Sequence, residues 1–175
     1  IGYTVSKDAS VPGYNLLQKN CTGYNSVTNT FTWEIVVNDS AVTMGNVKVT
    51  DTFDSAKMEY VSASEDLGED SDVSNGKLVF SLGTLSERKV ITVTTRILHP
   101  ETYFGTWTEF KNKAAMISSL NDTPIEKEAG KWVEVKEPEL LSKSGEFTRN
   151  SSGQLLSDGT ICWTVTVNEP QLAVE

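Results

Sequence analysis

The 175-residue sequence predicts an all-β protein built as a two-sheet sandwich. Short runs of Thr, Val and aromatic residues alternate apolar with polar positions, as strands with one buried face do. Gly, Asn, Asp and Ser separate these runs and supply turns. No stretch of helical length has apolar residues at the 3.6-residue spacing of an amphipathic helix. Six or seven such strands are typical of a β-sandwich.

The first three expected strands each carry a repeating apolar face. The strand at 3–7 has Lys7 on the same side as its apolar residues. The strand at 31–38 alternates aromatic and aliphatic residues with polar ones. The strand at 47–51 alternates in the same way and ends at Asp51, which shares the parity of the apolar residues.

Four further strands complete the expected sandwich. They lie at 78–82, 91–97, 110–116 and 133–135. In the strand at 110–116, Asn112 has the parity of its apolar neighbours and should face the interior.

Composition excludes several classes of partner. The net charge of −9 and the pI near 4.7 argue against nucleic acid, which is bound by clustered Lys and Arg. The same charge argues against docking on anionic lipid, and no apolar run is long enough for membrane insertion. A single histidine, His99, forms no recognised metal motif with Cys21 or Cys162. With no nucleophile elbow and no phosphate-binding glycine loop, we expect neither an enzyme nor a cofactor.

The sequence contains an internal repeat of domain length. Lys7 precedes a strand centred on Trp33, and Lys143 precedes a similar strand centred on Trp163. Each lysine follows a serine. A period of this length indicates tandem domains rather than a solenoid.

A charged, proline-bearing stretch at 136–139 marks the expected domain boundary. Residues 1–137 would form one complete module, and 138–175 the first strands of a second, similar module. Lys143 would be the second module's equivalent of Lys7.

Three polar residues, Lys7, Asp51 and Asn112, fall at core-facing positions of otherwise apolar strands. Burial disfavours the charged forms of a lysine and an aspartate. A neutral amine could attack the carboxamide carbon while the acid carries protons, which would leave a covalent Lys–Asn bond. A loop of about 100 residues closed in this way restricts the unfolded chain by roughly 4–5 kcal/mol. The alternatives are a solvated strand-end lysine, a turn aspartate and a hydrogen-bonded core or edge amide.

The pattern resembles the Cna-type and related repeat domains of Gram-positive surface adhesins and pilins. The matching segments, in order, are 31–38, 46–53, 82–85, 90–94 and 112–115. The resemblance implies an immunoglobulin-like sandwich and an extracellular, cell-wall-anchored protein.

The resemblance also implies an autocatalytic isopeptide bond between Lys7 and Asn112, assisted by Asp51 from the opposite sheet. This sequence departs from the family pattern by a long insertion between Asp8 and Asn29.

Three functions compete at this stage. The first is a self-cross-linked stalk module of an adhesin or pilus-like protein, in contact with neighbouring modules of its own chain. The second is a module that binds a host glycan or matrix protein, with Trp107, Trp132 and Tyr103 as its stacking platform. The third is an accessory domain of a secreted hydrolase. The repeat favours the first.

Overall fold

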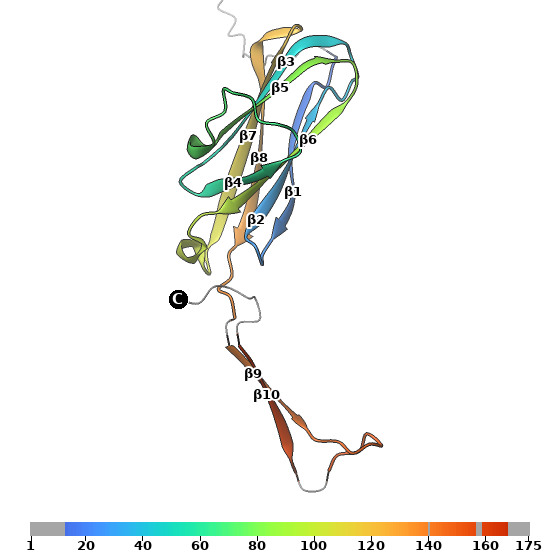
Figure 1. The fold of residues 1–175 in the computed structure, drawn as a ribbon, viewed down its shortest axis with the longest axis vertical. Coiled ribbons are helices and arrows are strands. Elements are labelled where there is room, and N and C mark those ends of the chain that lie inside the picture. The colour runs from blue at the N-terminus through green and yellow to red at the C-terminus, as the bar shows by residue number, and fades with distance from the viewer. Residues whose placement is uncertain (1–12, 140, 157–158, 168–175) are drawn as a thin grey trace, which may run out of the picture. The chain divides into compact units, whose positions relative to one another are not determined.

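The alternating residues of the first unit form two four-stranded sheets of antiparallel strands (Figure 1). The computed structural model describes residues 13–139, 141–156 and 159–167. The chain divides into two compact units, with the boundary between Val135 and Lys136. The prediction of an all-β sandwich is confirmed.

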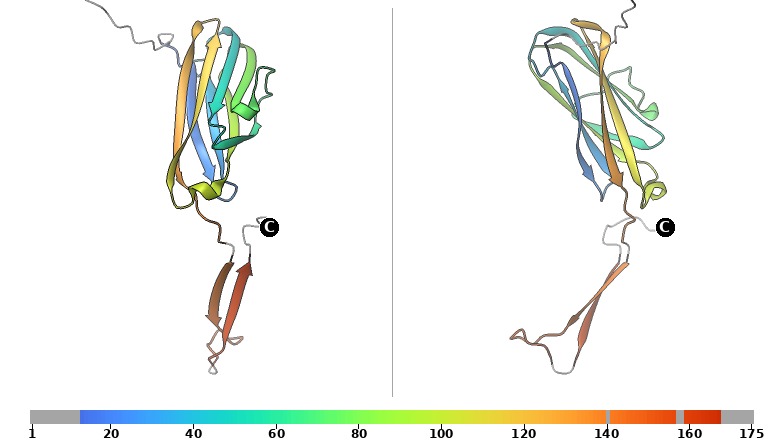
Figure 2. Two further views of the ribbon diagram at one scale, coloured as in Figure 1. Left: turned by 90° about the vertical axis from the view of Figure 1, so that its left-hand side faces the viewer. Right: turned by 180° about the vertical axis from the view of Figure 1, so that it is seen from behind.

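One sheet has the strand order β1-β2-β6-β4, and its strands are β1 (Leu17–Asn25), β2 (Thr30–Val37), β6 (Lys89–Ile97) and β4 (Met58–Ala63). The other has the order β5-β3-β7-β8, and its strands are β5 (Lys77–Leu85), β3 (Met44–Phe53), β7 (Trp107–Ser118) and β8 (Asn121–Glu134). The 3-10 helices η1 (Val73–Asn75) and η2 (Pro100–Tyr103) lie in connections. β1 and β8 are distant in the sequence but lie side by side where the two sheets meet (Figure 2).

Most expected strands are present close to their predicted positions: 31–38, 47–51, 78–82, 91–97 and 110–116. The expected strand at 133–135 is the end of the much longer β8. β4 was not expected, and its mixed burial pattern explains why alternation did not reveal it.

The segment between 8 and 29, expected to be an insertion relative to the family pattern, contains the strand β1. The strand pairs with β2 along its length, with a register shift between Cys21 and Gly23. The expected strand at 3–7 lies outside the described residues.

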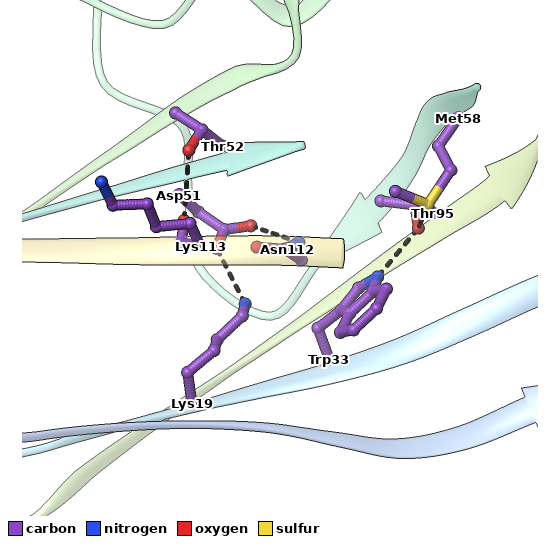
Figure 3. A network of polar contacts seen from close by, with 8 residues as sticks. All are labelled: Lys19, Trp33, Asp51, Thr52, Met58, Thr95, Asn112 and Lys113. Carbon is purple, nitrogen blue, oxygen red and sulfur yellow. Dashed lines mark hydrogen bonds and ion pairs between the residues drawn. The ribbon is translucent and has the colours of Figure 1, made fainter. Parts of the chain in front are cut away.

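The core lies between the sheets, and on the expected strands it consists mainly of residues whose parity predicted an inward orientation. Its largest fully buried side chains include Trp33, Phe31, Phe80, Phe110 and Leu17. Leu17 on β1 and Met58 on β4 also belong to the core but were not predicted. A chain of polar contacts runs along the inner face of the first sheet: the Trp33 indole N–H donates to the Thr95 hydroxyl at 2.9 Å, and that hydroxyl donates to the Met58 sulfur at 3.4 Å (Figure 3).

Thr95→Val should destabilise the first unit by about 1–3 kcal/mol, because valine keeps the shape but leaves the indole N–H without an acceptor. Thr94→Val on the opposite face of β6 is the matched control, and it should change the free energy of unfolding by less than about 0.5 kcal/mol. Urea denaturation of both variants measures the difference. Equal stability of the two would contradict a structural role for this hydrogen bond.

The second unit contains a two-stranded antiparallel sheet of β9 (Leu141–Phe147) and β10 (Ile161–Val167). Its register repeats that of β1 and β2. Lys143 pairs with the residue two positions after Trp163, and Lys19 pairs with the residue two positions after Trp33. In the structure, therefore, the counterpart of Lys143 is Lys19.

Candidate functional site

A lysine, an aspartate and an asparagine meet in the core of the first unit (Figure 3). The Lys19 Nζ donates to Asp51 Oδ1 at 2.7 Å, and the Asn112 Nδ2 donates to Asp51 Oδ2 at 3.0 Å. The side chains of Lys19 and Asp51 are both 0% exposed. These three residues form the candidate site.

Strand parity brings the three side chains together. Asp51 on β3 and Asn112 on β7 face the same interior from neighbouring strands of one sheet, and Asn112 pairs with Phe53, two residues beyond Asp51. Lys19 reaches them from β1, in the opposite sheet. Its orientation follows from that of Leu17, which is buried on the same face of β1.

The structure places two of the three predicted cross-link residues, Asp51 and Asn112, in contact in the core. Lys7 lies outside the described residues. The lysine beside Asp51 is Lys19, which sequence reasoning missed because β1 falls in the expected insertion. A signal was present: the tetrapeptide Leu-Leu-Gln-Lys ending at Lys19 resembles Leu-Leu-Ser-Lys ending at Lys143.

Burial shifts the two charged groups toward their neutral forms. Desolvation lowers the pKa of Lys19, although the negative charge and hydrogen bond of Asp51 oppose this change. Desolvation likewise raises the pKa of Asp51, opposed by Lys19 and by the hydrogen bond from Asn112. Transfer of one proton from Lys19 to Asp51 would remove both buried charges.

The Asn112 carbonyl oxygen is buried and has no hydrogen-bond partner within the described part of the chain. Such atoms are rare in cores, and leaving one unpaired costs about 1–3 kcal/mol. A half-turn of the carboxamide would bring this oxygen toward Asp51. A protonated Asp51 could then donate to it and increase the electrophilicity of the amide carbon.

Aromatic residues enclose the lysine. The Lys19 Nζ lies 5.9 Å from the centre of the Trp33 ring, and Phe31 packs between Trp33 and Phe110 with ring centres 5.4 and 5.1 Å away. These rings exclude water, which would otherwise solvate the ammonium and compete in any reaction at the amide.

The remaining predicted site residues do not join this cluster. Trp107 and Trp132 are 63% and 57% exposed on the outer face of β7 and β8. Tyr103 packs against the core, with its ring edge-on to Phe110 at 5.3 Å. In the second unit, the Lys143 Nζ lies 4.5 Å above the ring of Trp163.

Two features are absent from the part of the chain that the structure describes. Within 13–139, 141–156 and 159–167, no group of three or more His, Cys, Asp or Glu side chains is arranged to hold a metal ion. In the same ranges, no helix is long and apolar enough to cross a bilayer.

Comparison with known proteins gives structural similarity without sequence similarity. No protein-family model matches the chain, and no curated protein sequence matches it. The collagen-binding subdomain of the Enterococcus faecalis surface protein ACE has 12% identity and a TM-score of 0.41, over 67% of this chain and 96% of that one. The collagen-binding domain of a Staphylococcus aureus adhesin has 9% identity and a TM-score of 0.44, over 70% and 99%. The bacterial hydrophobin BslA has 13% identity and a TM-score of 0.48, over 71% and 98%.

Proposed function

We propose that the chain is a structural module of an extracellular, cell-wall-anchored bacterial adhesin or pilus-like protein, strengthened by an isopeptide bond between Lys19 and Asn112. The module is not an enzyme and needs no cofactor, because its single reaction joins two of its own side chains. The observation that carries the proposal is the fully buried contact of Lys19 and Asn112 with one carboxyl group, Asp51.

The reaction follows from this geometry. A proton passes from Lys19 to Asp51, and the neutral Nζ attacks Cγ of Asn112 while Asp51 donates to its carbonyl oxygen. The Nζ–Cγ bond forms, the Cγ–Nδ2 bond breaks, and Asp51 carries a proton from the attacking nitrogen to the departing one. One ammonia leaves, and Asp51 keeps the proton that it took from Lys19 in the first step, so it ends as the neutral carboxylic acid. The fold replaces a bimolecular encounter by fixed contact, which supplies a high effective molarity.

The bond would stabilise the module against unfolding. It joins β1 of one sheet to β7 of the other and closes a loop of about 90 residues, for which the chain-entropy model gives roughly 4–5 kcal/mol. Unlike a disulfide, an amide cannot be reduced. Both properties suit a protein that is stretched outside the cell.

The repeated hairpin supports a row of such modules. The equal registers of β1–β2 and β9–β10 suit a second module beginning near residue 138, with Lys143 as its reactive lysine. Each module would then have its neighbours in the same chain as partners.

The mass of the intact, purified chain tests the proposal. It should be one ammonia below the mass of the sequence. The full sequence mass in fully folded protein would reject the cross-link.

The rate of bond formation should be constant over a range of pH and should fall at lower and at higher pH. Below the raised pKa of Asp51, the pair holds an extra proton and Lys19 is an ammonium that cannot attack. Above the lowered pKa of Lys19, Asp51 is a carboxylate that cannot donate. Between the two, the pair carries a fixed number of protons, so the neutral fraction is constant.

Chain synthesised or solubilised without the bond can be refolded in buffers across this range, quenched at intervals and weighed. A rate that rises tenfold per pH unit throughout would show simple deprotonation of an exposed lysine and would contradict the coupled pair.

A further inference from the structure

We propose that the groove on the outer face of β7 and β8 binds a neutral oligosaccharide. The groove has a volume of about 650 Å³ and lies between these strands and the turn that follows β3. Its lining includes two tryptophans and six charged side chains: Trp107, Trp132, Asp54, Lys57, Glu109, Lys111, Lys113 and Glu128. Asn112 also lines the groove, but the inference does not depend on formation of the cross-link.

Two exposed indoles provide the stacking surface. Trp107 pairs with Glu134 and Trp132 with Glu109, so the two tryptophans are diagonal neighbours on one face of the β7–β8 pair. Both are more than half exposed, although tryptophan is usually largely buried. Flat indole faces match the C–H faces of pyranose rings, and the indole N–H can donate to a hydroxyl.

A glycine on β8 makes room for the Glu109 carboxyl group in the groove. Gly130 lies opposite Lys111 in the β7–β8 register, and the Glu109 carboxyl group lies over it. A Cβ at Gly130 would stand 2.6 Å from the Glu109 Oε1. Glycine within a strand often marks a position that a ligand or another group approaches closely.

The charges of the lining favour a ligand without net charge. Its three carboxylates and three ammonium groups balance, and some already pair: the Lys111 Nζ lies 3.1 Å from Glu128 and 3.7 Å from Glu109. An anionic or cationic ligand would therefore find no excess of the opposite charge.

Hydrogen-bonding capacity favours a glycan over a proline-rich peptide, another ligand of aromatic grooves. Carboxylates only accept hydrogen bonds and ammonium groups only donate them. Sugar hydroxyls do both, so they can satisfy Glu109 and Lys111 alike. A proline-rich segment offers carbonyl acceptors but few N–H donors, and it would leave the carboxylates unpaired.

The test is an array of neutral, sialylated and sulfated oligosaccharides, with a proline-rich collagen-like peptide on the same surface. A neutral oligosaccharide should bind, and calorimetric titration with that compound should give its Kd. Trp107→Ala and Trp132→Ala should each weaken the Kd at least about tenfold, or about 1.4 kcal/mol. Ile117→Ala, on the same face of β7 but outside the groove, should leave the Kd within about twofold.

Both tryptophan variants should keep the wild-type melting temperature and the mass of the cross-linked chain. Glycan binding therefore tests the groove, and the mass and melting temperature test the cross-link, so either proposal can fail while the other holds. Absence of any neutral glycan ligand, preference for charged glycans, preference for the peptide, or binding unaffected by the tryptophan variants would overturn the proposal.

Discussion

The purified Lys19→Ala variant should have the full mass of its own sequence, without the ammonia deficit expected of the wild-type chain. Its first unit should also be strongly destabilised. The variant removes the attacking amine, so no bond forms. Loss of a closed loop of about 90 residues costs roughly 4–5 kcal/mol, which lowers the Tm of a unit of this size by about 10–20 °C. Mass spectrometry and calorimetry measure the two effects on the same sample.

Asn112→Ala should give the same mass result, since it removes the acceptor carbon. Lys7→Ala is the matched control and should retain the ammonia deficit. If Lys7→Ala instead restored the full mass while Lys19→Ala did not, the assignment of the amine to Lys19 would be wrong.

Asp51→Ala should prevent the bond and also leave the Lys19 ammonium buried without a counter-ion. Removal of one partner of a buried ion pair typically costs about 3–5 kcal/mol, in addition to the lost cross-link. The unlinked Asp51→Ala chain should therefore be less stable than the double variant Asp51→Ala/Lys19→Met, in which an apolar chain fills the same space. Urea denaturation compares the two.

Asp122→Ala, at an exposed position of β8, is the control and should change neither mass nor stability appreciably. An Asp51→Ala chain that still carried the ammonia deficit would exclude Asp51 as the proton carrier. Equal stability of the single and double variants would show that the lysine is not held in the interior.

Strands with strong alternation could be predicted from the sequence because one buried face imposes a period of two. β1 could not. It is an edge strand whose inward series is Leu17, a lysine and a half-buried cysteine, and its register shift interrupts the period after Cys21. Alternation in that stretch does not distinguish a strand from a polar connection, and its one sequence signal is the similarity of residues 16–19 to 140–143.

The same limit explains the site. Asp51 and Asn112 lie within strands whose apolar neighbours fix their orientation, so parity alone places both in the interior. Strand parity does not show which of two lysines near the start of the chain, Lys7 or Lys19, lies beside Asp51. That choice depends on which segment pairs with β2, a contact between residues that propensity does not encode.

Tandem mass spectrometry of the trypsin-digested wild-type chain tests the Lys19–Asn112 bond most directly. Trypsin does not cleave after an acylated lysine, so a bond at Lys19 should yield segment 8–48 intact and joined to the segment that holds Asn112, with one ammonia missing. Linear, unmodified segments 8–19 and 20–48 would contradict the account, as would a branched segment 1–19.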